Sequence, residues 1–381
     1  MKKTARVFLS CLLSITTILL GSSTVFAISP AEITAPSAVL IEAETGKVLY
    51  EKESNQVRAC ASITKVMTLI LVFEAIDDGK ISMDDTITAS AHAASMGGSD
   101  IWLEEGETMS VHDLIKATVV ASANDAAVAL AEEVAGSEDS FVEKMNEKAK
   151  SLGMKNTTFK NCNGLDEDGH LTSAYDVALM SRELTKHKEI FEFTSIWMDY
   201  LRDGKTQIVN TNKLLKTYKG ITGLKTGTTS QAGSCISATA TRDGMSLISV
   251  VVGSATGKDR FTDAAALLDF GFANYCIYTP KYKEEIPIIS VKNGMQTELK
   301  AQANISGNFV IEKGQSKNVS CKLDIAEEVE APVNKGDKVG TLTFYIGDKK
   351  FKEYPVVASH IVDKMDFGSV FQLLFNFFIM T

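Results

Sequence analysis

A serine and a lysine stand three positions apart, at Ser62 and Lys65, where apolar periodicity predicts a helix over 62–77. Residues three apart are neighbours on a helix surface, so the amine can reach the hydroxyl. A serine hydroxyl becomes a good nucleophile only beside a base, and a lysine can be that base where burial and neighbouring cations lower its pKa. The pair predicts nucleophilic catalysis by Ser62, although alone a capping serine with a surface lysine is the commoner explanation.

A second polar group, Ser122-Ala123-Asn124, interrupts an apolar stretch over 118–130, inside a helix predicted over 111–135. Polar side chains in such surroundings need hydrogen-bond partners. They either make structural contacts only, or they belong to a site in which the Ser122 hydroxyl relays a proton and the Asn124 amide holds substrate backbone. The group by itself leaves both interpretations open.

The third group, Lys225-Thr226-Gly227-Thr228, lies in a predicted strand. A strand at a sheet edge can bind an extended peptide by pairing with it, and Gly227 would let the two backbones approach closely. Lys225 would supply a cation, and Thr226 or Thr228 a hydroxyl, for the carboxylate at the end of that peptide. Alone, the group is no more than a plausible strand end.

The elements that would bring these groups together follow from hydrophobic periodicity and turn residues. Strand patterns occur near both ends of residues 37–275, with helical patterns between them. This order indicates an α+β domain whose antiparallel sheet is built from both ends of the segment. The predicted elements are a hairpin over 37–52, helices over 62–77 and 111–135, strands over 221–228, 233–241 and 245–253, and a helix over 258–275.

Two further segments follow this domain. After Pro280 the sequence changes to short alternating runs with turns such as Asn293-Gly294, which predicts a separate all-β unit. A helix predicted over 363–381 is too short to span a bilayer, because a span needs about 20 residues, so it is expected to lie in the membrane interface. A terminal helix packed on the protein is the alternative. Its apolar face comprises Phe367, Phe371, Leu374, Phe375 and Phe378.

The first 27 residues have the composition of an export signal. Basic residues near the start precede an apolar run over 7–20, and Val25-Phe26-Ala27 fits a small-x-small cleavage site. We therefore expect an exported protein at the outer face of the cytoplasmic membrane, in contact with the cell wall. An uncleaved anchor helix is the alternative.

Composition argues against several classes of function. The net charge of −9 argues against nucleic acid as a partner, since binding there relies on basic surface. The five histidines form no H-E-x-x-H and the cysteines no C-x-x-C, so we expect no metal or other cofactor. No G-x-S-x-G is present, which argues against an α/β-hydrolase. His170, near Asp166 and Asp168, is expected in a loop beside the site, in a structural or a catalytic role.

The order and setting of the three groups resemble the S-x-x-K, S-x-N and K-T-G signature of penicillin-binding proteins and serine β-lactamases. Within these, nearly the whole chain resembles the low-molecular-mass D-alanyl-D-alanine carboxypeptidases. Two departures are Cys60, where that family often has proline, and a terminal helix without the usual basic residues. The similar segments are 61–68, 122–126, 163–165, 210–215 and 223–227.

The resemblance implies a domain order and an activity. A signal peptide over 1–27 would precede a β-lactamase/transpeptidase-like catalytic domain over 28–279, a small β-sandwich domain over 280–358 and an amphipathic membrane anchor over 359–381. The enzyme would remove the terminal D-alanine from peptidoglycan stem peptides ending in D-Ala-D-Ala, and β-lactam antibiotics would inhibit it covalently. The same site used as an endopeptidase or β-lactamase, and a catalytically silent wall-binding protein, are the alternatives.

The resemblance also implies a role for each motif residue. Lys65 would take the proton of Ser62, and the charge of Lys225 would help to keep Lys65 neutral. The backbone N–H groups of Ser62 and Thr228 would hold the oxyanion, and Ser122 would pass a proton to the departing amine. The implied catalytic residues are Ser62, Lys65 and Ser122, and the implied substrate-binding residues are Asn124, Lys225, Thr226, Gly227 and Thr228.

Overall fold

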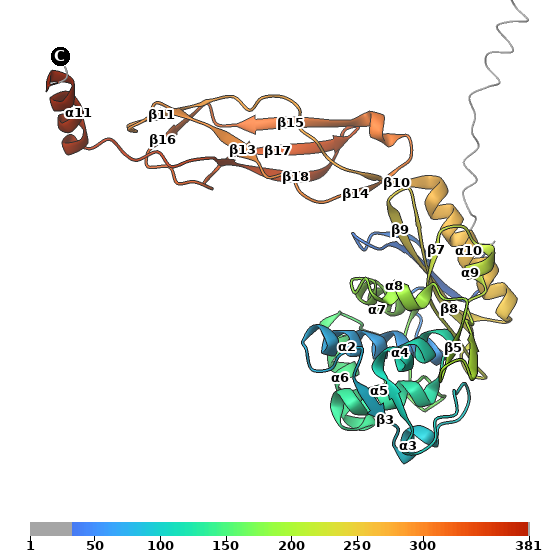
Figure 1. Cartoon of the computed structure of the whole chain (residues 1–381). Helices are drawn as coiled ribbons and strands as arrows, with labels where there is room; N and C mark the ends of the chain where they lie inside the picture. Colours follow the sequence, from blue (N-terminus) through green and yellow to red (C-terminus); the bar gives the residue numbers. More distant parts are fainter. Residues whose placement is uncertain (1–32, 380–381) are drawn as a thin grey trace, which may run out of the picture. The chain divides into compact units, whose positions relative to one another are not determined.

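The computed structural model describes residues 33–379. The expected export signal over 1–27 lies outside these residues. Contacts divide the chain into two compact units, one ending at Asn274 and the other starting at Tyr275. The first consists of a sheet with helices, and the second of strands followed by one helix (Figure 1). Each unit has a hydrophobic core of its own.

A five-stranded antiparallel sheet forms the centre of the first unit, in the order β2-β1-β9-β8-β7. Both ends of the unit's sequence meet in it, because β1 pairs with β2 on one side and with β9 on the other. β7 is the last strand in this order. Within the described residues, therefore, no strand pairs with its outer edge. The strands are β1 (Ser37–Glu42), β2 (Val48–Lys52), β7 (Ile221–Thr229), β8 (Gly233–Arg242) and β9 (Met245–Ser254).

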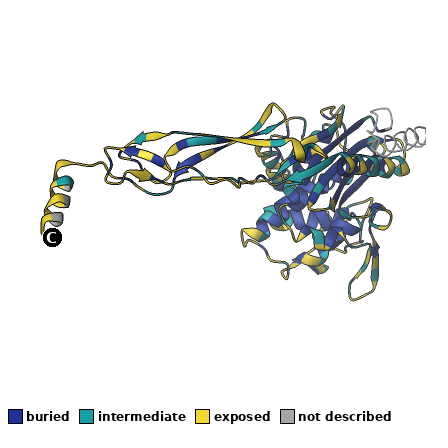
Figure 2. Cartoon of the chain, turned by 90° about the horizontal axis from the view of Figure 1, so that it is seen from above, coloured by how far each residue is buried: buried dark blue, intermediate teal, exposed yellow. Residues whose placement is uncertain are grey.

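Helices cover both faces of this sheet. On one face Gly271 of α10 packs so closely that a Cβ there would lie 2.5 Å from Leu247 Cδ1 of β9. On the other, Ser181 Oγ of α7 lies 2.7 Å from Ser237 Oγ of β8. α2 packs on α7 and is buried along most of its length. Figure 2 colours buried residues dark blue, and these gather in the part of the molecule that contains the sheet and its helices. The main helices are α2 (Lys65–Asp77), α4 (Val111–Val120), α5 (Asn124–Ala135), α6 (Glu138–Ser151), α7 (Ala174–Leu184) and α10 (Gly257–Asn274).

The prediction of a single helix over 111–135 is wrong, because the structure has two helices there, α4 and α5. Ser122 takes a left-handed conformation with a φ of 62°, which interrupts the helical backbone. Asn124 then begins α5, and its backbone N–H donates to Ser99 O at 2.6 Å. Alanine and valine favour burial on both sides of the break, so apolar periodicity alone gave no sign of it.

Short elements connect the main ones. The hairpin of β5 and β6 and the pair of β3 and β4 stand outside the central sheet. These strands fall in the region where the sequence showed mainly helical patterns. The short elements are β3 (Thr86–Thr88), α3 (Ala91–Ala94), β4 (Thr108–Ser110), α8 (Ile190–Thr194), β5 (Met198–Leu201), β6 (Thr206–Val209) and α9 (Leu214–Thr217).

The second unit is all-β up to its final helix. One sheet has the order β13-β18-β17-β15 and another the order β12-β11-β16, while β10 pairs with β14. Its core includes Leu342 and Phe344 of β17 and Tyr354 of β18. The strands are β10 (Tyr275–Tyr278), β11 (Ile289–Lys292), β12 (Glu298–Leu299), β13 (Ala301–Ala303), β14 (Phe309–Glu312), β15 (Val319–Ile325), β16 (Glu328–Glu330), β17 (Lys338–Ile346) and β18 (Lys349–Ala358).

The last element is α11 (Phe367–Ile379), which carries no charged residue. The rings of Phe367, Phe371 and Phe375 follow one another along it, with neighbouring centroids 6.5 and 6.3 Å apart. All three of these rings are exposed. Among the described residues, no helix has the length and apolar character needed to cross a bilayer.

Candidate active site

Ser62 lies on a single 3-10 turn, Ala61–Thr64, directly before α2. Lys65 is the first residue of α2 and is fully buried, whereas Ser62 is partly accessible. Lys65 Nζ lies 3.1 Å from Ser62 Oγ. The turn and the helix therefore bring the amine into hydrogen-bond distance of the hydroxyl.

Two other contacts of the Lys65 amine suit its neutral form. Nζ donates to Asn124 Oδ1 at 2.5 Å and to the Asn163 carbonyl at 2.6 Å. Asn124 Nδ2 donates to Gly97 O at 2.7 Å, which fixes the amide so that its oxygen faces the lysine. A neutral amine has two N–H groups and one lone pair. With both N–H groups engaged, the lone pair is left for the Ser62 hydroxyl, as a general base requires.

Burial lowers the pKa of Lys65 to about 7, against the opposing effect of acidic neighbours that include Asp100 and Asp125. An ammonium ion without water is costly, so the buried site favours the neutral amine. Burial is therefore the main cause of the lowered pKa of Lys65. The sequence led us to expect that the charge of Lys225 would contribute as well.

Lys225, on β7, joins the second and third motifs. Its Nζ donates to Ser122 Oγ at 2.7 Å and to Thr226 O at 3.1 Å. Burial lowers the pKa of Lys225 well below its usual range, and the charges of Lys65 and Arg260 lower it further. The left-handed backbone at Ser122 thus presents its hydroxyl to β7. Lys65 is close enough to lower the pKa of Lys225.

Gly227 is the point at which β7 contacts the turn that carries Ser62. A Cβ at this position would lie 2.8 Å from Cys60 O and 3.0 Å from the backbone nitrogens of Ser62 and Ile63. Real side chains do not tolerate backbone atoms at such distances. Only glycine therefore allows the strand to lie directly against the Ser62 turn.

The two threonines of the K-T-G segment differ in exposure. Thr226 is buried, and its Oγ1 lies 2.6 Å from Thr211 Oγ1. Thr228 is exposed near the end of the edge strand. Thr228 is thus the more accessible of the two hydroxyls to a peptide that pairs with β7.

Arg260 of α10 is a site residue that the sequence analysis missed. Its Nη1 donates to Gly227 O at 2.8 Å and to Thr228 Oγ1 at 2.7 Å. Burial is the main cause that lowers the pKa of Arg260, and its Nε is buried without a hydrogen-bond partner among the described residues. A single arginine in a helix carries no sequence signal, since its contact depends on how α10 crosses β8 and β9.

Asn163 and His170 come from the loop before α7. Asn163 contributes its backbone carbonyl to Lys65, a role that the side-chain pattern could not reveal. His170 is buried, and its Nε2 lies 2.7 Å from Thr64 Oγ1. Burial lowers the pKa of His170 to about 4, so the imidazole is neutral near pH 7. Its contact with the site is through Thr64.

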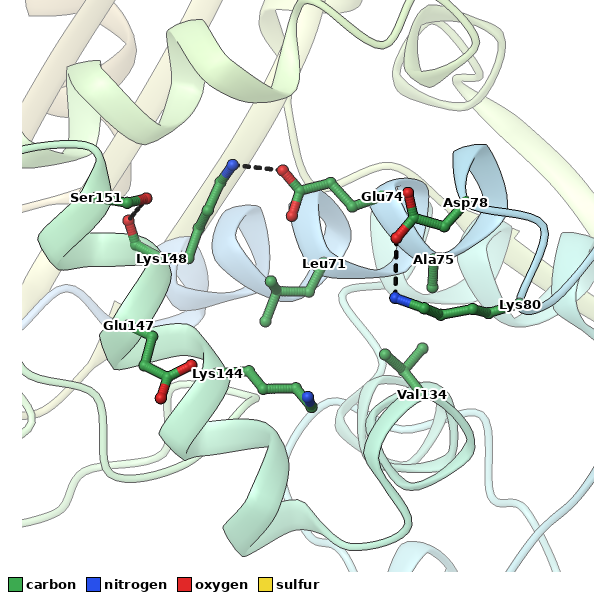
Figure 3. Close-up of a pocket in the computed structure, with 10 residues that line it drawn as sticks. All are labelled: Leu71, Glu74, Ala75, Asp78, Lys80, Val134, Lys144, Glu147, Lys148 and Ser151. Atoms are coloured by element: carbon green, nitrogen blue, oxygen red, sulfur yellow. Dashed lines mark hydrogen bonds and ion pairs between the residues drawn. The ribbon is translucent and has the colours of Figure 1, made fainter.

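One cavity of the first unit lies apart from these residues. It has a volume of about 360 Å³ and is lined by α2, α5 and α6 (Figure 3). Charged pairs cross its walls, between Lys148 and Glu74 and between Lys80 and Asp78. It contains none of the motif residues, so the motif cluster around Ser62 is the candidate active site.

Comparison with known proteins agrees with this geometry. Residues 24–256 match the model of the D-alanyl-D-alanine carboxypeptidase family, and residues 281–364 match that of the penicillin-binding protein 5 C-terminal domain. The chain is 45% identical over 339 residues to D-alanyl-D-alanine carboxypeptidase DacF of Bacillus subtilis (strain 168), covering 87% of each sequence.

Two solved structures are also similar to this chain. Penicillin-binding protein 5 from Haemophilus influenzae has a TM-score of 0.77 and 32% identity, over 88% of this chain and 100% of that one. Penicillin-binding protein D2 from Listeria monocytogenes, in its ampicillin-bound form, has a TM-score of 0.58 and 36% identity, over 62% of this chain and 97% of that one. The fold is therefore that of penicillin-binding protein 5, with a catalytic and a C-terminal all-β domain. On these grounds the chain belongs to the D-alanyl-D-alanine carboxypeptidase family of serine hydrolases.

Proposed function

We propose that Ser62 performs the carboxypeptidase reaction, removing the terminal D-alanine of a peptidoglycan stem peptide through an acyl-enzyme. The observation that carries this proposal is the contact of 3.1 Å between Ser62 Oγ and Lys65 Nζ. Both N–H groups of a neutral Lys65 are engaged by the acceptors of Asn124 and Asn163, so its lone pair is free to take the Ser62 proton.

Acylation starts when Ser62 attacks the carbonyl between the two D-alanines and Lys65 accepts the hydroxyl proton. Negative charge then develops on the carbonyl oxygen, and the backbone N–H groups of Ser62 and Thr228 stabilise it. Gly227 supports this assignment, since it lets the strand that carries Thr228 lie against the Ser62 turn. Each such donor typically contributes about 3–4 kcal/mol to transition-state stabilisation.

The departing D-alanine amine needs a proton as the bond breaks. Ser122 gives its hydroxyl proton to this amine and takes in exchange the proton that Lys65 received from Ser62, which returns Lys65 to its neutral form. Lys225 Nζ donates to the Ser122 hydroxyl at 2.7 Å and holds it in place for this transfer. Water then opens the acyl-enzyme, with Lys65 again acting as the base. Free D-alanine and a stem peptide one residue shorter are the products.

The substrate peptide binds as an additional strand beside β7. The unpaired edge of β7 supports this mode, because it offers backbone donors and acceptors to an extended peptide. The terminal carboxylate faces the hydroxyls of Thr226 and Thr228 in the field of Lys225 and Arg260. Asn124, with its side chain fixed between Lys65 and Gly97, positions the peptide on the opposite side.

The surroundings of the enzyme follow from its two ends. The composition of residues 1–27 supports export, and the exposed aromatic face of α11 supports attachment to the outer face of the cytoplasmic membrane. We assign catalysis to residues 28–279, a β-sandwich to 280–358 and membrane contact to 359–381. β-Lactam antibiotics acylate the same serine.

Replacing the nucleophile tests this function directly. We expect Ser62→Ala to release no D-alanine from a D-Ala-D-Ala tripeptide and to show no covalent labelling by a fluorescent penicillin. Ser230→Ala, which removes an exposed hydroxyl directly after β7, serves as the matched control and keeps both properties. Covalent labelling that persists in Ser62→Ala would refute the assignment of the nucleophile.

A further inference from the structure

A buried series of hydrogen bonds ends on the peptide group before Ser62. The backbone N–H of Lys160 donates to His170 Nδ1 at 3.1 Å. His170 Nε2 lies 2.7 Å from Thr64 Oγ1, and this hydroxyl donates to Ala61 O at 2.9 Å. Thr64 is fully buried, and His170 is 4% exposed. The contact of the Ser62 hydroxyl is with Lys65 and not with the side chains of Thr64 or His170. The mechanism described above uses neither of these two side chains.

The direction of every bond in this series is determined. Because Nδ1 of a neutral His170 accepts from Lys160, the ring proton must be on Nε2. Nε2 therefore donates to Thr64 Oγ1, which leaves the single hydroxyl hydrogen of Thr64 for Ala61 O. Burial keeps the pKa of His170 at about 4, despite the charges of Glu167 and Asp166, so this arrangement holds near pH 7.

Ala61 O and the Ser62 N–H belong to one planar peptide group. A bond that fixes the carbonyl oxygen therefore fixes the direction of the N–H as well. It also polarises the peptide group and makes the N–H a stronger donor. Ala61 needs such support, because its φ of 50° is an unfavourable conformation for alanine.

Two glycines hold the same peptide group by close packing. A Cβ at Gly164 would lie 2.1 Å from Ala61 O and 2.9 Å from the Ser62 nitrogen, and one at Gly227 would lie 3.0 Å from that nitrogen. The peptide group thus has glycine backbones packed against it, and the Thr64 hydroxyl is bonded to its oxygen. The available space leaves it little freedom to rotate.

We propose that His170 and Thr64 are positioning residues that orient the Ser62 N–H toward the oxyanion. The inference rests on the proposed role of Ser62 and adds a function for a histidine that touches neither substrate nor nucleophile. His170 acts only through Thr64 and the Ala61 carbonyl. Its effect therefore belongs to the transition state, in which the oxyanion forms, and not to binding of the substrate.

The test compares variants that remove or keep the hydrogen bonds. His170→Leu and Thr64→Val each lower kcat for a D-Ala-D-Ala peptide and the rate constant of penicillin acylation by roughly tenfold or more, with KM changed less than twofold. The expected loss is smaller than the roughly 10²–10³-fold loss in kcat that follows complete removal of an oxyanion donor, because the Ser62 N–H is still present. Thr64→Ser and His170→Gln, which keep a hydroxyl and a donor at the Nε2 position, restore most of the rate.

Three controls separate positioning from folding and from a wrong nucleophile. The rate of acylation is proportional to the concentration of folded enzyme. The rate constant therefore does not depend on which fraction of a variant is folded. Phe141→Leu, a buried substitution in the same core, lowers the melting temperature but leaves that rate constant unchanged. Ser62→Ala is not labelled at all. Covalent labelling of Ser62→Ala would refute the proposed function itself, whatever result the histidine variants give.

The proposal is overturned if His170→Leu and Thr64→Val acylate within twofold of the unaltered enzyme per folded molecule. It is also overturned if only KM rises, or if Thr64→Ser is as slow as Thr64→Val. A lower melting temperature with an unchanged rate constant would assign His170 a purely structural role.

Discussion

Lys65 has exchanged water for three polar contacts, and in the proposed mechanism this exchange lets it act as a base. In water its amine would be protonated at neutral pH, and a protonated amine cannot accept the proton of Ser62. Burial changes that balance by disfavouring the ammonium ion. The contacts to Asn124 and Asn163 then orient the neutral amine. Residue type and burial together therefore decide the chemistry.

The first prediction at this scale concerns pH. Because the pKa of Lys65 is lowered to about 7, the neutral amine is the major form above that pH and the minor form below it. The rate constant of penicillin acylation is therefore expected to rise with pH, level off above about 7, and fall roughly tenfold per pH unit well below it. Stopped-flow measurement between pH 5 and 9 tests this. A rate that rises only near pH 10 would show that Lys65 keeps an ordinary pKa.

His170 does not interfere with this measurement. Its pKa is lowered to about 4 by burial, so it stays neutral over nearly the whole range. A step near pH 7 is therefore assigned to Lys65, whose pKa burial lowers to about 7.

At the scale of elements, the site depends on two features of the backbone. One is a break between two helices, and the other is a close contact between a strand and a turn. The break between α4 and α5 lets the Ser122 hydroxyl accept from Lys225 in the site instead of lying within a helix. Gly227 of β7 lets the strand approach the Ser62 turn. Both features use backbone geometry to bring distant motifs together.

Filling the narrow contact at β7 tests the second feature. Gly227→Ala is expected to lower both thermal stability and penicillin acylation, because its Cβ would meet Cys60 O at 2.8 Å and the Ser62 nitrogen at 3.0 Å. A loss of about 1–3 kcal/mol in stability is typical of overpacking. Chemical denaturation and acylation kinetics measure the two effects.

Gly257→Ala is the matched control for this change. Its Cβ would have no neighbour nearer than Arg260 Nη2 at 4.0 Å, and its φ is not positive. It is expected to keep the stability and acylation rate of the unaltered enzyme. If Gly227→Ala behaved like Gly257→Ala, the close contact between β7 and the Ser62 turn would be wrong.

The elements also show what sequence patterns can and cannot reveal. The strands predicted over 221–228, 233–241 and 245–253 agree with β7, β8 and β9 to within a residue at each end, because buried strands bounded by turns have a clear pattern. The break at Ser122 had no such pattern, since local propensity there favours helix and tertiary contacts override it. Arg260 and the Asn163 carbonyl were missed for a related reason, because packing and backbone position bring them to the site.

At the scale of the whole molecule, the two units differ in the size of their cores and in their exposed apolar surface. The first contains the large core and the cluster around Ser62 that we propose as the active site. The second is all-β and ends in α11, where the side chains of Phe367, Phe371, Leu374, Phe375, Phe378 and Ile379 are exposed. Such an uncovered aromatic face on a charge-free helix suits a lipid interface better than water.

The prediction at this scale concerns membrane binding. The double variant Phe371→Asp and Phe375→Asp is expected to lose co-sedimentation with lipid vesicles while its kcat on a soluble peptide stays unchanged. Because α11 has no cations, binding of the unaltered protein should differ little between neutral and anionic vesicles. Ile288→Asp, an exposed apolar position elsewhere in the second unit, is the control and should bind normally. Binding that persists in the double variant would contradict a membrane role for α11.

The central claim is that Ser62 is the residue acylated in this enzyme. The most direct measurement is mass spectrometry of the protein after reaction with penicillin and digestion by trypsin. Cleavage after Arg58 and Lys65 releases the segment 59–65, in which Ser62 is the only serine. The account requires the penicilloyl mass to be found on this segment and, after fragmentation, on Ser62. An adduct on Ser122, on Cys60 or on no residue would contradict it.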